Sequence, residues 1–310
     1  MEKVEYGGWA NCVRLANDVV ELIATGDVGP RIIRFGFLGG GNEFKEFDEM
    51  LGRTGDDEWL IYGGHRLWHA PEEKPRTYYP DNNPVHIEVP APGASVLHIR
   101  QDVEPTTGIE KDMKVVLPAD NTAHVLVKHR LRNRGSWPVE LAPWALTVLA
   151  QGGRVVVPLP PRGSHEENLL PANTLTMWPY TNMSDPRWTW GERFILLGQD
   201  PEATCPQKVG VMVPSGWAAY ARDGHLFVKT FTYQRGAAYP DWGCSVETFT
   251  NNEMIELETV GPLTTLAPGE SVDHVEDWYL FDGVPVPQND GDVEKHVMPK
   301  VLSVLPAENR

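Results

Sequence analysis

Short apolar or alternating runs, separated by turn residues, recur along the whole chain. Residues 19–24 and 31–36 are early examples, and residues 226–233, 244–250 and 254–260 are later ones. Glycine (29) and proline (27) are spread between the runs and mark turns. Strands do not alternate with helical patterns, so a parallel βαβ sheet is not expected. The pattern predicts an all-β fold of large antiparallel sheets.

Helical signals are weak and confined to two segments. Residues 43–51 could form a short helix, and residues 293–304 a C-terminal one that Pro299 would break. The 310 residues allow one large β domain or two ordinary ones. Since neither a low-complexity linker nor an internal repeat divides the chain, we expect a single domain over residues 1–310.

Composition excludes several classes of partner. The formal net charge of −16 argues against nucleic acid as a partner. The three cysteines, Cys12, Cys205 and Cys244, form no metal or redox motif, and their odd number fits a reducing compartment. The first residues carry no apolar leader, and no run reaches the roughly 18 apolar residues of a membrane span. We expect a cytoplasmic protein without a cofactor; the sequence does not indicate the oligomeric state.

An acidic hairpin near the C-terminus is the most distinctive local feature. Asn251-Asn252 suits a two-residue turn between two short strands. That turn would place Glu247 opposite Glu256 and Ser245 opposite Glu258. Because side chains alternate across a strand, the carboxylates of Glu247, Glu256 and Glu258 would share one face, and the other face would be apolar. A three-residue turn would separate Glu247 from the other two.

The crowding of these carboxylates requires an explanation. Like charges directly opposite on a sheet cost up to about 1 kcal/mol. Solvent, a neighbouring arginine, a proton held by one carboxylate or the hydroxyls of a ligand would each offset that cost. A solvated acidic face and a ligand site are therefore both open interpretations.

Residues 63–72 form a second notable segment, Gly-Gly-His-Arg-Leu-Trp-His-Ala-Pro-Glu. His65 and His69 have the spacing of a zinc-binding histidine pair on a helix. The flanking glycines and proline disfavour a helix, and the sequence has no motif that would supply further zinc ligands. No metal site is therefore predicted. In an extended segment His65 and His69 would face one side, and Arg66 and Trp68 the other. This segment is either a wall of a binding site or a loop packed by Trp68.

A third group combines polar and aromatic residues in expected loops and strands, and the chain has 11 tryptophans. Tryptophan and tyrosine rings can stack on the apolar faces of sugars, although such rings also pack in cores. The members of the group are Tyr180, Arg187, Trp188, Lys229, Asp241 and Trp242.

His129 is a separate case. It lies on the apolar face of its strand and is expected to be a buried, hydrogen-bonded core histidine.

Residues 243–248, 266–270 and 278–281 resemble the C-terminal part of galactose mutarotases (aldose 1-epimerases). In that family a strand with a Leu-Glu-Thr-Gln-like motif carries the catalytic carboxylate, and a Pro-Gly-Glu turn follows. Glu247 matches this glutamate by its spacing to Pro268-Gly269-Glu270. Leu257-Glu258-Thr259 is the more literal match, and the closer spacing in hexose-6-phosphate mutarotases favours Glu258 or Glu256.

The resemblance extends to the first half of the chain and implies a fold. Residues 29–32 and 63–66 resemble an early strand and a sugar-contacting segment of the superfamily. The resemblance implies a β-supersandwich, a large antiparallel sandwich with a concave sugar site. Expected substrate-binding residues are Arg31, Arg66, Trp68, Trp144, Arg187, Lys229, Asp241 and Glu256.

One departure from the family concerns the general acid. Galactose mutarotases carry a Thr-Asn-His-x-Tyr-Phe-Asn motif whose histidine is that acid, whereas residues 141–147 here contain no histidine. Mutarotation needs a base for the anomeric hydroxyl and an acid for the ring oxygen. Glu247, with Glu258 as its rival, is the expected base. The acid would come from elsewhere, for example His65 or His129, or the activity is absent.

These observations predict a carbohydrate-active protein that binds a small sugar or sugar derivative and interconverts its anomers, like an aldose 1-epimerase. The missing histidine keeps a second class open, a non-catalytic carbohydrate-binding or sensing protein. A lyase or hydrolase acting on an acidic glycan is a third, by analogy of fold alone.

Overall fold

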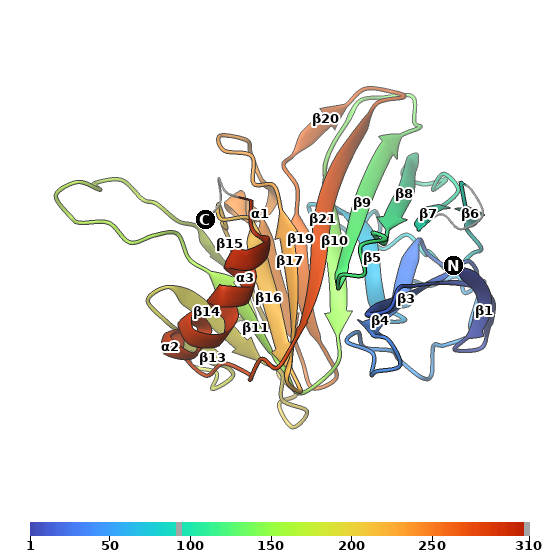
Figure 1. Ribbon diagram of the computed structural model, residues 1–310. Helices are drawn as coiled ribbons and strands as arrows, with labels where there is room; N and C mark the ends of the chain where they lie inside the picture. The colour runs from blue at the N-terminus through green and yellow to red at the C-terminus, as the bar shows by residue number, and fades with distance from the viewer. Residues whose placement is uncertain (91–94, 307–310) are drawn as a thin grey trace. The chain divides into compact units, whose positions relative to one another are not determined.

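A computed structural model describes residues 1–90 and 95–306 (Figure 1). Its regular elements are mostly antiparallel strands, as the alternating runs predict. The chain divides into two compact units, Met1–Ala150 with Leu263–Trp278 and Gln151–Pro262 with Tyr279–Arg310. A single domain over the whole chain stays a prediction.

The first unit contains two runs of neighbouring strands. One follows the order β1-β2-β3-β4-β5-β10, with β20 also paired to β10, and the other the order β21-β9-β8-β7-β6. The strands are β1 (Glu2–Tyr6), β2 (Trp9–Ala16), β3 (Val20–Thr25), β4 (Arg31–Phe37), β5 (Gly64–Ala70), β6 (His86–Glu88), β7 (Val96–Arg100), β8 (Ile109–Val116), β9 (His124–Asn133), β10 (Val139–Leu149), β20 (Thr264–Leu266) and β21 (Ser271–Asp282), the last of which belongs to this unit up to Trp278.

Strict alternation along β9 illustrates how sequence sets the core of this unit. Val125, Val127, His129 and Leu131 are buried, and the residues between them are partly exposed. The Trp278 ring packs against Phe35 and Phe44, with ring centroids 5.8 and 5.6 Å apart. Such apolar burial is the main favourable contribution to folding.

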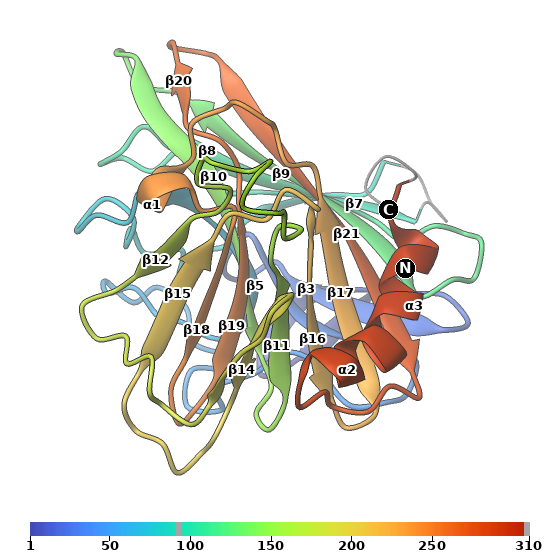
Figure 2. The ribbon, with the colours of Figure 1, turned by 90° about the vertical axis from the view of Figure 1, so that its left-hand side faces the viewer.

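The second unit also contains two runs of strands, in the orders β19-β18-β15-β12 and β13-β14-β11-β16-β17. Figure 2 shows β12, β15, β18 and β19 side by side. The strands are β11 (Arg154–Pro158), β12 (Leu175–Met177), β13 (Trp188–Trp190), β14 (Phe194–Gly198), β15 (Gln207–Val211), β16 (Trp217–Arg222), β17 (His225–Phe231), β18 (Val246–Thr250) and β19 (Ile255–Val260), and α1 (Pro240–Gly243) is a single turn before β18.

The C-terminal helical segment is confirmed. It consists of α2 (Asp290–Asp292), a π-helical turn η1 (Val293–Val297) and α3 (Met298–Val304) (Figure 1). Val293, Val297 and Val301 pack on the buried strands β11, β14, β16 and β17. Pro299 does not break the segment as predicted. It lies in the first turn of α3, directly after the π-helical turn η1.

The helix expected over residues 43–51 is not present. Phe44 and Glu46 form isolated bridges with Leu149 and Gly63, and the segment ends in turns. Phe44 and Phe47 are buried from an extended chain, so pairing with neighbouring strands replaces the local helical hydrogen bonds. Across the described parts of the chain, helices are too short and too polar for one to cross a membrane.

Candidate functional site

The acidic hairpin lies in the second unit and has a different register from the one predicted. Glu247 pairs with Glu258, and Phe249 with Glu256. The prediction of a two-residue turn is wrong, because residues 251–254 form a four-residue connection. The Asn251 side-chain oxygen accepts hydrogen bonds from the backbone N–H groups of Glu253 and Met254, at 2.8 and 3.0 Å, and this stabilises the longer turn.

The face on which the carboxylates lie is nevertheless as expected. The observed register is displaced by two residues, and side chains repeat on a face every two residues, so the faces are unchanged. Glu247, Glu256 and Glu258 share one face. The displacement brings Glu247 directly opposite Glu258.

Lys208 supplies the cation that the crowded carboxylates require. It lies on β15, the strand next to β18, opposite Phe249. Its Nζ atom is 2.8 Å from Oε2 of Glu247 and 3.2 Å from Oε2 of Glu258. Glu247, Glu258 and Lys208 are only 1%, 0% and 5% exposed. A buried ammonium group therefore holds two buried carboxyl groups together.

The protonation of this group follows from burial and from its charges. Burial raises the pKa of Glu247 well above the usual range, Glu258 and Asp241 raise it further, and Lys208 only partly opposes them. Burial lowers the pKa of Lys208, but the neighbouring glutamates outweigh burial and hold that pKa high. Lys208 therefore stays charged, while Glu247 is the carboxyl group that retains a proton.

Aromatic residues and a glycine surround the carboxyl pair. The Trp178 ring centroid lies 4.7 Å from Nζ of Lys208. Gly210 pairs with Glu247 on β15, and a Cβ atom there would lie 2.5 Å from Sγ of Cys244 and 3.4 Å from the Trp178 ring. Glycine at this position therefore allows Cys244 and Trp178 to pack closely beside Glu247.

The predicted loop residue Asp241 lies in the same neighbourhood. It is part of the turn α1, in which Asp241 and Trp242 both have positive φ. The Thr176 hydroxyl donates to the backbone carbonyl of Asp241 at 2.9 Å. Trp242, the next residue, is 89% exposed.

Two predicted substrate-binding cations have protein partners in the second unit. The Arg187 guanidinium donates twice to Asp185, at 2.9 Å each, and also to backbone carbonyls of Ala203 and Cys205. Lys229 is buried and donates to the carbonyl of Leu257 at 3.2 Å. Both stabilise local structure, and their contact with substrate stays a prediction.

In the first unit, β5 presents its residues as the extended interpretation predicts. The chain enters this strand through Gly63 and Gly64, which have positive φ. A Cβ atom there would lie 2.0 Å from the carbonyl oxygen of Lys45 and 2.3 Å from that of Ile32, so only glycine fits. This glycine pair therefore serves close packing of the backbone.

His65 forms a buried pair with His129. Its Nε2 atom lies 2.7 Å from Nε2 of His129, and its Nδ1 atom lies 2.8 Å from the Thr147 hydroxyl. Nδ1 of His129 lies 3.0 Å from the carbonyl oxygen of His274. The buried, hydrogen-bonded histidine expected at residue 129 is confirmed.

The partners assign the protons of this pair. A carbonyl oxygen only accepts, so Nδ1 of His129 carries a hydrogen. With both imidazoles neutral, Nε2 of His129 accepts from Nε2–H of His65, and the Thr147 hydroxyl donates to Nδ1 of His65.

Glu276 lies beside the pair, with Oε2 3.9 Å from Nε2 of His65, and it accepts a hydrogen bond from Nε1 of Trp278 at 2.7 Å. Ligand atoms of His65, His129 and Glu276 lie within 4.8 Å of one another, as in a metal site. Zinc bonds of about 2.0–2.1 Å in tetrahedral geometry would place the two nitrogens about 3.3 Å apart. The observed 2.7 Å is instead the distance of a hydrogen bond.

The other side of β5 carries Arg66 and Trp68. The Arg66 guanidinium lies over the Trp59 and Trp68 rings, 5.3 and 4.7 Å from their centroids. Trp68 pairs with Trp144 across β5 and β10, and their rings pack edge to face at 5.5 Å. The structure thus brings together three predicted residues and adds Trp59, whose isolated position in an acidic loop gave no pattern to find it by.

Arg31 supports the loop before β5. Its guanidinium donates to the carbonyls of Ile61 and Gly63, at 2.9 and 2.6 Å, and forms a buried ion pair with Asp81 at 3.0 Å. Burial lowers the pKa of Arg31, and Asp81 partly opposes this. Its contact with substrate stays a prediction.

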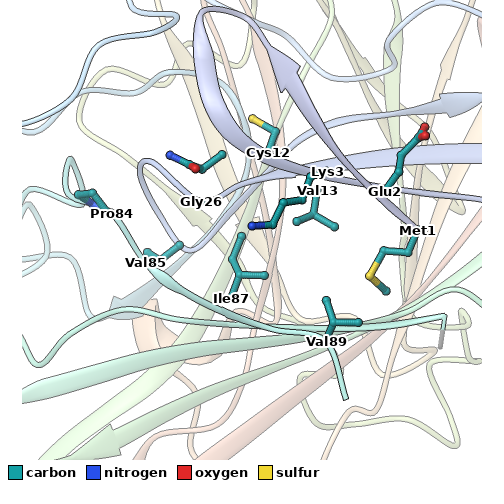
Figure 3. A pocket seen from close by; sticks show the side chains of 11 residues that line it. Met1, Glu2, Lys3, Cys12, Val13, Gly26, Pro84, Val85, Ile87 and Val89 are labelled. Carbon is teal, nitrogen blue, oxygen red and sulfur yellow. The ribbon is translucent and has the colours of Figure 1, made fainter. Parts of the chain in front are cut away.

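A cavity of about 550 Å³ lies elsewhere in the first unit. Figure 3 shows Met1, Lys3, Val13, Ile87 and Val89 around it. None of the predicted site residues lines this cavity. Its walls are mainly aliphatic, and Glu2, Lys3, Asn11 and Cys12 supply their polar or titratable side chains.

Comparison with known proteins identifies the fold. No protein-family model matches the chain, and no curated protein matches it by sequence. Several solved structures, however, do match the chain. A protein from Synechocystis sp. is 10% identical with a TM-score of 0.59, and the match covers 91% of this chain and 100% of that one.

Two further structures agree with this likeness. A galactose mutarotase-like protein from Lactobacillus casei is 10% identical, with a TM-score of 0.56 over 87% of this chain and 100% of that chain. A candidate aldose 1-epimerase from Escherichia coli K12 is 13% identical, with a TM-score of 0.52 over 88% of this chain and 99% of that chain. At such identities the likeness establishes the fold alone.

Proposed function

Because the chain has the galactose mutarotase-like β-sandwich fold, we propose that it is a carbohydrate-active protein that interconverts the anomers of a small sugar, as an aldose 1-epimerase does. The observation that carries this proposal is the buried pair of Glu247 and Glu258 around Lys208. The pair offers a proton donor and a proton acceptor side by side.

The pair supplies the acid that the missing histidine would otherwise provide. Anomer exchange requires a base to take the proton of the anomeric hydroxyl and an acid to protonate the ring oxygen. Glu247, whose pKa is raised, takes the role of the acid here, not that of the base expected from the sequence, and donates its proton to the ring oxygen. Glu258 accepts the hydroxyl proton. The ring opens to the aldehyde, which rotates, and the reverse transfers close it as the other anomer. A carboxyl group whose pKa is raised, with a second carboxyl group beside it, is suited to these opposite roles.

Burial places a condition on this mechanism. Glu247 is 1% exposed, so a sugar reaches it only when a covering group moves. Trp178 is the leading candidate, because it is only partly buried and its ring lies on Lys208. Once displaced, its ring would offer an apolar face on which a sugar can stack.

Arg66 with Trp59, Trp68 and Trp144 is proposed as a sugar-contacting cluster of the first unit. Because Arg66, Trp68 and Trp144 are only 2%, 4% and 2% exposed, Trp59 is the member that a sugar can reach directly. A guanidinium beside two indole rings combines donors for hydroxyl groups with apolar faces for stacking. Trp59 is only partly buried, so Trp59→Ala should weaken sugar binding without removing a core side chain.

Saturation-transfer NMR of anomer exchange, across a panel of neutral aldoses, tests the catalytic proposal. Glu247→Gln and Glu258→Gln should each reduce the exchange rate by about 10²-fold or more, the usual contribution of acid–base catalysis. Glu253→Gln, an exposed change in the connection of the same hairpin, is the matched control. If no sugar is accelerated, or if both variants retain the wild-type rate, the catalytic proposal fails.

A non-catalytic sugar-binding or sensing protein is the second candidate. The ion pairs with Lys208 favour it, because a carboxylate held by an ammonium group is a weaker base. Calorimetric binding of a sugar whose anomer exchange is not accelerated would identify this function.

A further inference from the structure

Trp242 is the most exposed large apolar side chain in the described part of the chain, at 89%. It belongs to the turn α1, which precedes β18, the strand that carries Glu247. Single exposed apolar residues are common on protein surfaces, but the backbone and the position of this one are unusual. An exposed indole ring offers a rigid apolar face on which a ligand can stack.

The backbone of α1 is strained at two successive residues. Asp241 has φ +50° and ψ +42°, and Trp242 has φ +64° and ψ +29°. This left-handed region is unfavourable for residues other than glycine, and a bulky side chain there is an outlier. Such strain persists only where the surrounding structure imposes it, and it is frequent at ligand-binding sites. Tryptophan at this position therefore suggests a role other than stability.

Buried residues on both sides of the turn hold it in place. Before the turn, the Tyr239 ring stacks on Tyr233, with ring centroids 5.0 Å apart and an angle of 8° between the ring planes. After it, the thiol of the buried Cys244 donates to the backbone carbonyl of Asp241 at 3.1 Å. These contacts fix the backbone from which the Trp242 side chain projects.

The turn lies on the same face of the sheet as the proposed catalytic group. Thr176, Gly210, Glu247 and Glu258 lie opposite one another in a row across β12, β15, β18 and β19. Residues directly opposite each other share a face. The Thr176 hydroxyl donates to the backbone carbonyl of Asp241 at 2.9 Å, so α1 covers the β12 end of this row (Figure 2).

The spacing along the row exceeds one sugar ring. Two strand spacings, about 10 Å, separate Thr176 from Glu247. The carboxyl pair and the turn are thus spaced for two linked rings. Asp241 is partly exposed, and its charge raises the pKa of Glu247, so it lies close enough to act on that group. Its carboxylate can accept hydrogen bonds from sugar hydroxyls near the turn.

We infer that the substrate is a reducing sugar of two or more rings, whose reducing-end ring binds at Glu247 and Glu258 and whose next ring stacks on Trp242. This inference rests on the proposed function and names the class of sugar on which it acts. Trp242 determines specificity and touches no reacting atom. A sugar ring suits the turn because its C–H face matches the indole and its hydroxyl groups match Asp241.

Calorimetric titration of the intact protein tests this inference. The ligands are maltose, cellobiose and lactose, compared with their reducing-end ring glucose, and galactobiose, compared with galactose. At least one disaccharide should bind about tenfold or more tightly than its reducing-end monosaccharide, because stacking buries an additional apolar face.

Variants of Trp242 assign this gain to the indole ring. Trp242→Asn should remove the gain and leave monosaccharide affinity within about twofold, since asparagine tolerates positive φ and preserves the turn. Trp242→Tyr keeps an aromatic ring and should retain most of the gain. Trp137→Asn is the matched control, because Trp137 is 80% exposed in the first unit, and it should leave all affinities unchanged.

The comparison of one-ring and two-ring sugars in the wild-type protein needs no variant, so it remains decisive if a variant does not fold. Binding of a monosaccharide without any gain from a second ring would overturn this inference and leave the proposed function intact. A full gain in Trp242→Asn would overturn it as well. If none of these sugars binds, this inference and the proposed function both fail.

Discussion

Glu247 lies directly opposite Glu258 across the paired strands β18 and β19, and the ammonium group of Lys208 lies within 3.2 Å of both. Two carboxyl groups in a buried site cannot both ionise without compensation. The lysine and a retained proton together neutralise the group. This arrangement makes stability and proton transfer depend on the same three side chains.

Lys208→Met should lower the free energy of unfolding at pH 7 by about 3–5 kcal/mol, because it leaves two buried carboxyl groups without their cation. Urea denaturation measures the loss. The loss should shrink as pH is lowered and both carboxyl groups become protonated. Lys114→Met, on the exposed side of β8, should change stability by less than about 0.5 kcal/mol. Equal effects of the two variants would contradict the buried ion pairs.

Glu247 should make the protein less stable as pH rises above about 4.5, its pKa in the unfolded chain. Its folded pKa is raised, so between the two pKa values the native state holds one proton more than the unfolded state. The free energy of unfolding then falls by up to about 1.4 kcal/mol per pH unit. Urea denaturation between pH 5 and pH 7 measures this slope.

Glu247→Gln should remove this contribution and flatten the profile. Glu104 does not interfere, since its folded pKa is lowered to about 2 and its contribution is lost only as pH falls below its unfolded pKa of 4.5. An unchanged slope in Glu247→Gln would show that Glu247 is ionised throughout this range.

The sequence predicts the shared face of the glutamates because a face depends only on the period of two along a strand. The register depends on a local detail, the Asn251 side chain that accepts two backbone hydrogen bonds and lengthens the turn. Lys208 could not be placed from sequence, since the pairing of β15 with β18 joins segments about 40 residues apart. The only signal was a lysine beside the apolar run Val209–Val213, where a buried charge needs a partner.

The pair of His65 and His129 is likewise only partly predictable from the sequence. Alternation along β9 predicts that His129 is buried, and the extended form of β5 predicts the side that His65 faces. Their contact across the core of the first unit depends on the stacking of non-neighbouring strands, which periodicity does not encode.

Gly210→Ala should destabilise the protein by about 1–3 kcal/mol, as overpacking of a filled core does. The added methyl group would lie 2.5 Å from Sγ of Cys244 and 3.4 Å from the Trp178 ring. The double variant Gly210→Ala with Cys244→Ala should recover most of that loss, because it removes the sulfur atom that the methyl group contacts. Thermal unfolding of the single and double variants measures the coupling. Purely additive losses would show that the contact with Cys244 is not the cause.

His65→Asn separates a structural role of His65 from a catalytic one. The variant removes the donor to Nε2 of His129 and the acceptor of the Thr147 hydroxyl, so the free energy of unfolding should fall by about 1–3 kcal/mol. If the carboxyl pair supplies the acid, the anomer exchange rate of the folded variant should stay within about threefold of wild type. His86→Asn, on the exposed strand β6, is the matched control and should change neither quantity. A loss of about 10²-fold or more in exchange rate, in a variant that is still folded at the assay temperature, would instead make His65 the general acid.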